Sequence, residues 1–462
     1  MPFGHNARTS GPRWLRRACI LLLAVLTPLL QAQVLSSRPN PADPHFPFNT
    51  PGPVKSPATS AQFDQWRTQI KSALFISNPL PTLAPKSYGM FSPAEGVIAE
   101  RVTYGTRFGM RIPAIVYRPA HSEGKLPAMV VVDGHGGDKT SWYAFYTGIL
   151  YARAGAVVVT YDPIGEDERN SDRKSETREH DSVIKGPHSP ERMGGLMVTD
   201  VMQAVSYLSQ RPDVDAARIA VLGYSMGSFI SAIASAVDPR IRVLVLSGGG
   251  DLDGNMGSWD RSSKIMCQAG PYRALSFLPD KAAILYALHQ RSGTTLILNG
   301  TVDALVGRPH HFKPFFADLN MRIAALTGTR ANLPESRFFA RVGHRPSWVT
   351  RQAALWLQEQ LHFPNWTAAK INAMGTTHIS AWAKATGAHI NNGYAVEDRE
   401  GGIRALGTGI PNVPWADLQA LPEARWQQEK ERFTWDAWVQ HALAADGIRG
   451  SDQKSFYPAG RS

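Results

Sequence analysis

Short, continuous apolar runs alternate with amphipathic stretches over much of the chain. The apolar runs occupy residues 126–134, 154–162, 217–225, 241–249 and 294–300, and a last predicted strand covers 336–343. Helical spacing of apolar residues predicts helices at 142–155, 197–210 and 349–361. Buried runs separated by helices are typical of a mostly parallel sheet covered by helices on both faces. The pattern therefore predicts the α/β class.

The segments on either side follow other patterns. Residues 63–76 predict a helix, and residues 98–119 predict an antiparallel pair of strands that turns near Gly109. Residues 366–462 break the alternation with a Gly-, Asn- and Pro-rich middle and a predicted helix at 422–445. The chain thus divides into a leader and helix at 34–95, an α/β core at 96–365 and a mainly helical extension at 366–462.

The extension is rich in aromatic residues. It carries six of the twelve tryptophans, among them Trp426, Trp435 and Trp438. They could form a platform on which sugar rings stack, or the apolar face of a helix that packs onto the main domain. Packing is the favoured interpretation.

The first residues predict export. Residues 1–33 combine four arginines, an apolar run from Ala18 to Leu30 and small or polar residues near Ala32, which is the layout of a cleaved signal peptide. The run is short of the roughly 20 apolar residues that span a bilayer, and no later run has that length. We therefore expect a periplasmic or secreted protein with no stable membrane span after cleavage.

Charge and cysteine content exclude some classes of function. The formal net charge is +11, but Lys and Arg do not form a stripe with aromatic residues between them, so we predict no nucleic-acid binding. The two cysteines are Cys19, inside the signal, and Cys267, so no internal disulfide is expected. Cys267 is interpreted as a buried structural cysteine. No metal-binding motif is present, and we expect no metal and no cofactor.

A serine lies between two glycines at a predicted strand-to-helix turn. Residues 223–227 read Gly-Tyr-Ser-Met-Gly, the G-x-S-x-G form that lifts a nucleophilic Ser225 above the sheet. The pentapeptide alone also fits a structural turn. Its partners decide the matter, because Asp303 and His344 each follow a predicted strand, in the order Ser, Asp, His. A hydroxyl needs such a base and such an orienting acid to become a nucleophile.

Other residues compete for these roles. Asp251 follows the preceding strand and is the alternative acid, although Asp303 is favoured. His310 and His311 follow Asp303 too closely and are predicted to begin the next helix. Asp162 and Glu166 are expected to tie down the loop after their strand.

An oxyanion forms when the serine attacks, and it needs hydrogen-bond donors. The backbone N–H of Met226 is free at the start of the helix. The second donor is expected from the glycine-rich loop at 134–138, from either His135 or Gly136. The His135 side chain is interpreted as shaping the loop or facing the substrate.

With these features the chain resembles the α/β-hydrolase superfamily, in particular its bacterial acetyl xylan esterases and dienelactone-hydrolase-like members. The similar stretches include VVVDGHGGDK, YDPIGEDER, GYSMGS, LNGTVDALV and VGHRPSW. The resemblance implies an α/β-hydrolase fold, a triad of Ser225, Asp303 and His344, and a carboxylic ester substrate such as a decorated plant polysaccharide. The alternatives are a peptidase of the prolyl oligopeptidase type and a non-catalytic binding protein on the same scaffold.

Overall fold

The computed structural model describes residues 57–255, 257–303, 305, 309–390 and 402–448. These residues belong to one compact unit that spans residues 49–462. The predicted signal peptide at 1–33 and most of the predicted leader lie outside the described residues.

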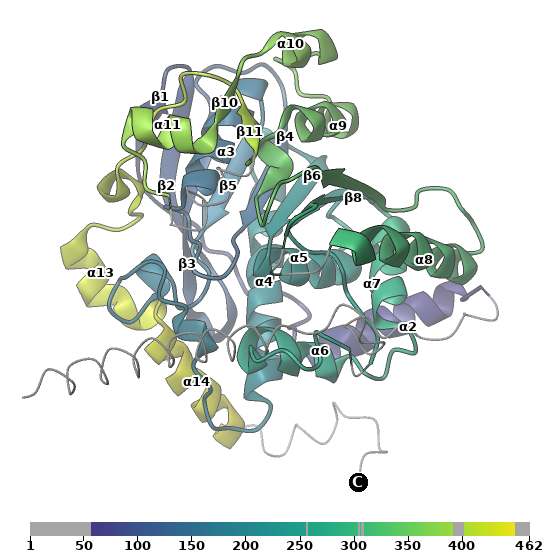
Figure 1. Cartoon of the computed structure of the whole chain (residues 1–462). Coiled ribbons are helices and arrows are strands. Elements are labelled where there is room, and N and C mark those ends of the chain that lie inside the picture. Colours follow the sequence, from purple (N-terminus) through teal and green to yellow (C-terminus); the bar gives the residue numbers. More distant parts are fainter. Residues whose placement is uncertain (1–56, 256, 304, 306–308, 391–401, 449–462) are drawn as a thin grey trace, which may run out of the picture. The chain divides into compact units, whose positions relative to one another are not determined.

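A nine-stranded sheet forms the centre of this unit (Figure 1). The strands are β1 (Lys86–Ala94), β2 (Val97–Gly105), β3 (Arg111–Pro119), β4 (Leu126–Val132), β5 (Val157–Tyr161), β6 (Val214–Tyr224), β7 (Val243–Ser247), β8 (Thr294–Gly300) and β9 (Glu335–Phe339). Their order is β1-β2-β3-β5-β4-β6-β7-β8-β9. Neighbours from β5 to β9 pair in parallel, whereas β1, β2 and β3 are antiparallel. Each predicted strand is present, and the mostly parallel sheet is confirmed.

Helices cover both faces of the sheet, as the pattern predicts. They are α2 (Ser60–Ala73), α3 (Trp142–Ala154), α4 (Ser189–Ser209), α5 (Met226–Val237), α6 (Gly270–Ala274), α7 (Lys281–Gln290), α8 (Pro309–Thr327) and α9 (Arg351–Leu361). On one face α5 lies between α4 and α7, and α8 packs on α7 (Figure 1). On the other face α3 and α9 share a core with alternate residues of the strands.

The sequence pattern missed the edge strand β1. Its residues are mostly exposed or half-buried, and a turn at Gly96 connects it to β2. An edge strand that faces solvent needs no apolar run, so no hydrophobic signal marked it.

The residues after 365 pack onto the core. They form α10 (Ala368–Ala373), β10 (Thr376–His378), α11 (Ile379–Thr386), β11 (Arg404–Leu406), α13 (Glu423–Glu429) and α14 (Trp435–Ile448). Of the six tryptophans only Trp415 is substantially exposed. Trp382 donates a hydrogen bond to the Ile410 carbonyl over 2.7 Å, and its ring packs edge-on against Tyr146 of α3. The packing interpretation is therefore confirmed for most of these rings, and no exposed row of rings forms a platform in the described part of the extension.

The single helix predicted at 422–445 is wrong, because the chain forms two helices there. α13 ends at Glu429, and α14 begins at Trp435. Between them the Phe433 ring is fully buried, and the Thr434 carbonyl accepts the first hydrogen bond of α14 from Trp438 over 3.0 Å. A 3-10 turn at Lys430–Arg432 separates the two helices, so one continuous helix does not form.

A buried ammonium group joins three segments of the chain. Lys139, from the loop after β4, is fully buried, and its Nζ lies 2.6 Å from Asp162 Oδ2 and 2.9 Å from Glu168 Oε2. It also contacts Asp167. Burial opposes its charge, but the three carboxylates raise the pKa of Lys139 well above its ordinary value. The group is therefore a cation held by three acids inside the protein.

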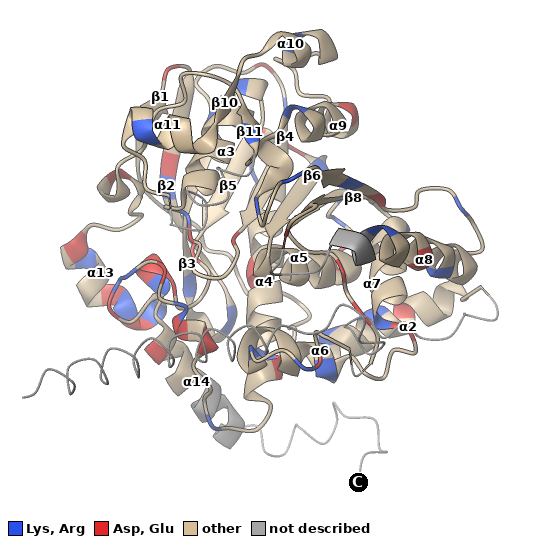
Figure 2. Cartoon of the chain, viewed as in Figure 1, with Lys and Arg blue, Asp and Glu red and all other residues tan. Residues whose placement is uncertain are grey.

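The extension completes this network. The backbone N–H groups of Ala420 and Leu421 donate to Glu168 over 2.7 and 2.8 Å, and Gln419 donates to Asp167 over 2.9 Å. Figure 2 shows acidic and basic residues gathered beside α13, where this loop lies. Two of the buried acids, Asp167 and Glu168, thus accept hydrogen bonds from N–H groups of the extension.

Two predicted loop residues have the expected role. Asp162 pairs with Lys139, and Glu166 accepts hydrogen bonds from the backbone of Arg178 over 2.8 Å and of Thr177 over 3.1 Å. Burial raises the pKa of Glu166 to about 8. Both carboxyl groups tie down the loop after β5.

Within the residues that the structure describes, no helix is both long enough and apolar enough to cross a membrane.

The network predicts a large effect of one substitution. Lys139→Met keeps most of the side-chain volume but leaves three buried carboxylates without their cation. We expect the free energy of unfolding to fall by about 3–5 kcal/mol, as when one partner of a buried ion pair is removed. Denaturant unfolding followed by circular dichroism measures the change.

The matched control is Lys174→Met, in the loop after β5 that carries the three acids. Lys174 pairs with Asp172, but both side chains are largely exposed, and such pairs contribute about 0–1 kcal/mol. Equal decreases in the free energy of unfolding of the two variants would contradict the role assigned to Lys139.

Candidate active site

Ser225 lies where β6 turns into α5. Its backbone has φ 54° and ψ −115°, a left-handed conformation that is strained for a residue with a side chain. The Ser225 N–H donates to the Ser247 carbonyl of β7 over 2.9 Å, which fixes the turn to the neighbouring strand. This is the strand–turn–helix context that the G-x-S-x-G pattern predicts.

The two glycines of the pattern allow close approach of the helix to the sheet. A Cβ atom on Gly227 would lie 2.2 Å from the Val132 carbonyl oxygen at the end of β4. A Cβ atom on Gly223 would lie 2.4 Å from the Gly227 carbonyl oxygen and 2.7 Å from Ser231 Oγ. Both positions therefore exclude side chains, as the G-x-S-x-G pattern requires.

His344 and Asp303 lie together at the carboxyl ends of adjacent strands. His344 Nδ1 is 2.7 Å from Asp303 Oδ2, and the Asp303 side chain is fully buried. Tyr224, the residue before Ser225, donates from its hydroxyl to the His344 carbonyl over 3.0 Å, and the two rings are 5.0 Å apart. The imidazole therefore lies beside Tyr224, the residue before Ser225, and its Nδ1 contacts Asp303.

The alternative acid Asp251 is placed differently. It is buried, and burial raises its pKa well above the ordinary value. Its carbonyl accepts a hydrogen bond from the Trp259 indole over 3.1 Å. The carboxylate that contacts the His344 ring is that of Asp303, and its role as the acid of the triad stays a prediction.

The glycine-rich loop lies directly against the serine. Residues 134–137 form a tight turn in which the Gly137 N–H donates to the Gly134 carbonyl over 3.0 Å, with Gly136 at φ 74°. A Cβ atom on Gly134 would approach Ser225 Cβ to 3.0 Å. The backbone of this turn and the first N–H of α5, at Met226, thus flank the same serine.

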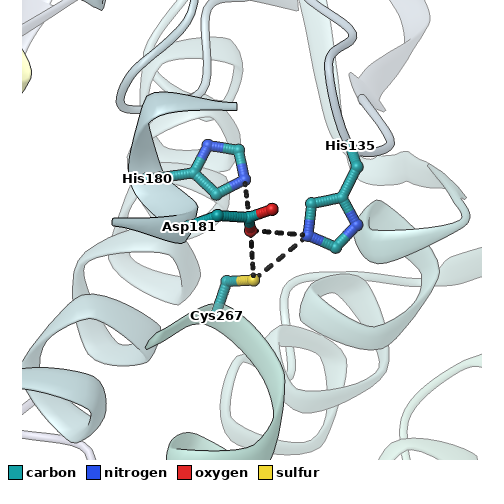
Figure 3. A group of neighbouring side chains, drawn as sticks. All are labelled: His135, His180, Asp181 and Cys267. Carbon is teal, nitrogen blue, oxygen red and sulfur yellow. Dashed lines mark hydrogen bonds and ion pairs between the residues drawn. The ribbon is translucent and has the colours of Figure 1, made fainter. Parts of the chain in front are cut away.

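The side chain of His135 has partners that the sequence did not indicate (Figure 3). Its Nε2 lies 3.1 Å from Cys267 Sγ and 3.3 Å from Asp181 Oδ1, and its ring stacks on that of His180 at 5.4 Å. The His135 side chain therefore shapes the loop, which leaves its backbone N–H as the candidate donor. Cys267 is buried, as expected, but not in an apolar setting.

This four-residue group was missed for a clear reason. Residues 135, 180, 181 and 267 lie on three distant segments, and no short spacing marks them as neighbours. Burial, together with the nearby His135, lowers the pKa of His180 to about 3, so its imidazole is neutral at neutral pH.

Comparisons with known proteins find similarity in the fold and in the sequence around Ser225. A model of the acetyl xylan esterase (AXE1) family matches residues 77–247, which include Ser225 and the glycine-rich loop. The solved structure of a methylesterase, BT1017, superposes with a TM-score of 0.51 at 16% identity and covers 86% of this chain and 76% of that chain. The chain has the α/β-hydrolase fold, so the resemblance seen in the sequence is confirmed.

Curated relatives match over shorter regions. The putative hydrolase YtaP of Bacillus subtilis is 28% identical over 146 residues, which cover 29% of this chain and 47% of the relative. The acylamino-acid-releasing enzyme of Sus scrofa is 27% identical over 214 residues, which cover 43% of this chain and 27% of the relative. The chain thus spans less than half the length of each of these two relatives.

The close approach at Gly227 predicts a loss of stability. In Gly227→Ala the new methyl group meets a backbone carbonyl oxygen that belongs to the sheet, so the helix has to move. We expect the free energy of unfolding to fall by about 3 kcal/mol or more, at the upper end for overpacking.

Gly96→Ala provides the comparison. Gly96 has φ 75°, but no atom lies within 4 Å of the position that a Cβ atom would take there, so the variant carries only left-handed backbone strain of roughly 1–2 kcal/mol. Urea unfolding of both variants measures their free energies of unfolding. A Gly227→Ala protein as stable as Gly96→Ala would contradict the steric role of Gly227.

Proposed function

We propose that this protein is an exported serine hydrolase that cleaves a carboxylic ester of a carbohydrate through an acyl-enzyme intermediate. The observation that carries the proposal is the 2.7 Å contact between His344 Nδ1 and Asp303 Oδ2 beside the strained Ser225 turn. The contact leaves Nε2 as the nitrogen that exchanges protons. The proposal needs no cofactor.

In the first half of the reaction, the Ser225 hydroxyl attacks the ester carbonyl carbon while His344 Nε2 accepts its proton. The imidazolium that forms is stabilised by the Asp303 carboxylate. The carbonyl oxygen becomes an oxyanion, for which we propose the backbone N–H of Met226 and that of His135 or Gly136 as donors. One such donor lowers the free-energy barrier by about 3–4 kcal/mol.

In the second half, the intermediate collapses. The bond to the alcohol oxygen breaks, and His344 returns its proton to that oxygen as the alcohol leaves. A water molecule then attacks the acyl carbon while His344 accepts a proton from it, the bond from that carbon to Ser225 Oγ breaks, and His344 returns the proton to Oγ. The products are the free acid and the original serine hydroxyl.

The family match supports an esterase that acts on a decorated polysaccharide, because the matching family is described as acetyl xylan esterase. An acetyl group on xylan is therefore the proposed substrate, with feruloyl and glucuronoyl esters as the competitors to be measured. The arrangement of residues 1–33 supports export, to the periplasm or the medium. We propose residues 96–365 as the catalytic domain and 366–462 as an extension that supports it.

A peptidase is the second candidate, since the acylamino-acid-releasing enzyme is among the relatives. It shares the same nucleophile, so substrate choice separates the two. Faster cleavage of acylated or proline-containing peptides than of any ester would favour the peptidase.

Removal of the nucleophile should abolish hydrolysis. We expect Ser225→Ala to lower kcat on acetylated xylan and on p-nitrophenyl acetate by at least about 10⁴-fold, and to lose labelling by a fluorophosphonate. Ser235→Ala is the control on the same helix, because the Ser235 hydroxyl bonds only within the helix, to the Ala232 carbonyl. We expect it to retain activity. A Ser225→Ala protein that still cleaves these esters would overturn the proposal, as would a wild type that cleaves no member of a panel of acetyl, feruloyl and glucuronoyl esters.

A pair of isosteric substitutions tests the acid. Asp303→Asn should lower kcat by about 10⁴-fold, because an amide holds the wrong tautomer of His344. Asp251→Asn should change kcat little, because the carboxylate that contacts His344 Nδ1 belongs to Asp303. Steady-state kinetics decide between them, and the opposite ranking would assign the role to Asp251.

A further inference from the structure

Four potential metal ligands converge beside the glycine-rich loop (Figure 3). They are His135, from the loop after β4, His180 and Asp181, from the short helical turn Glu179–Asp181, and Cys267, from the π-helical turn Ile265–Ala269. One ligand atom from each residue lies within 4.8 Å of all the others. We propose that these residues form a structural Zn²⁺ site.

Four separations between these atoms lie within about 0.2 Å of the range expected around a tetrahedral zinc ion. His135 Nε2 is 3.1 Å from Cys267 Sγ and 3.3 Å from Asp181 Oδ1, Cys267 Sγ is 3.5 Å from Asp181 Oδ1, and His180 Nε2 is 3.9 Å from the same oxygen. Zinc binds N, O and S ligands at about 2.0–2.3 Å, so tetrahedral ligands lie roughly 3.3–3.8 Å apart. Two nitrogens, one sulfur and one oxygen are donors that zinc accepts.

His180 gives an independent indication. Its side chain is fully buried, and its Nε2 has no hydrogen-bond partner among the described residues. The other ring nitrogen, Nδ1, lies 3.0 Å from the Ile164 carbonyl oxygen, which can only accept a hydrogen. Nδ1 therefore carries the proton, and Nε2 points a lone pair into the group. This arrangement is typical of a metal-bound histidine whose second nitrogen is fixed by a carbonyl.

The geometry does not suit a second nucleophile. In a Cys–His–Asp relay the acid bonds to the imidazole nitrogen that does not face the thiol. Here Cys267 and Asp181 both approach Nε2 of His135, so neither orients the ring for the other. Convergence of a sulfur and a carboxylate on one nitrogen is expected of ligands that share an ion.

The acidic group around Lys139 makes a useful contrast. Asp162, Asp167 and Glu168 also lie close together, but the ammonium group of Lys139 contacts all three. In the group with His135, by contrast, Lys264 contacts Asp181 at its other oxygen, Oδ2. That contact orients Asp181 and leaves Oδ1 directed at the group.

The site would be closed, because four protein ligands complete a tetrahedron. Its role is therefore to fix structure rather than to activate water. Zinc would hold His135, and with it the turn at 134–137, against the segments that carry Asp181 and Cys267.

Metal analysis of the full-length protein tests the proposal. After equilibration with ZnCl₂ and removal of free metal, we expect about one zinc ion per chain, as a single site requires, and a chelator should lower the thermal unfolding midpoint. Cobalt substitution should produce a thiolate-to-metal charge-transfer band. Cys267→Ser and His180→Gln should each weaken zinc binding by more than about 100-fold, beyond what loss of an outer-shell partner costs.

His289→Gln is the matched control. His289 is a fully buried histidine whose Nε2 lies 3.2 Å from the Thr294 carbonyl oxygen, outside this group. We expect the variant to bind zinc like the wild type, which separates ligand loss from general damage. A wild type that holds no zinc, or a folded Cys267→Ser protein that binds zinc as tightly as the wild type, would overturn the proposal. Loss of zinc in His289→Gln as well would overturn it too.

Discussion

The buried ammonium group of Lys139 is the contact on which much of this structure depends. A charge inside a protein is costly unless opposite charges surround it. Lys139 meets this condition with Asp162, Asp167 and Glu168, and two of those acids in turn bond to the extension. Lys139 follows the glycine-rich turn at 134–137 by two residues, so the same contact sets the position of that turn.

The rest of the site follows from the sheet. Parallel strands end at one edge, and Ser225, Asp303 and His344 come just after β6, β8 and β9. The chain orders these strands so that distant segments reach one edge of the sheet, where the Tyr224 hydroxyl, beside Ser225, donates to the His344 carbonyl. Gly223 and Gly227 then set how closely α5 approaches β4, and the strain at Ser225 is held by bonds to β7.

Hydrophobic pattern and turn chemistry were sufficient to predict the parallel sheet and the residues around Ser225. Each apolar run is buried in the structure, and the glycine spacing has a direct steric cause. The pattern failed in two places. The edge strand β1 is largely exposed and has no apolar run. A 3-10 turn at Lys430–Arg432 divides the helix predicted at 422–445, although Phe433 and Trp426 share a small core.

The sequence also did not predict the buried polar clusters whose members are distant from one another along the chain. Lys139 is fully buried although lysine is ordinarily exposed, and nothing in its local sequence marks it. The group of His135, His180, Asp181 and Cys267 was likewise invisible, because its members meet only after the chain has folded. Ser225, Asp303 and His344 could be proposed together because each follows a predicted strand, whereas no such position marks the members of these buried polar groups.

The shared core of the extension has a consequence for how such proteins diversify. Residues 366–418 contribute Trp382, Ala405 and Leu418 to the same apolar cluster as α3, and in the described part of the extension a separate core begins only at Ala420. A segment of this kind cannot be exchanged between proteins as a self-contained module, because its removal would uncover the face of α3 and the acids around Lys139. We therefore expect the extension to diverge in evolution by single substitutions, which are matched by substitutions in the loop after β5 that it contacts.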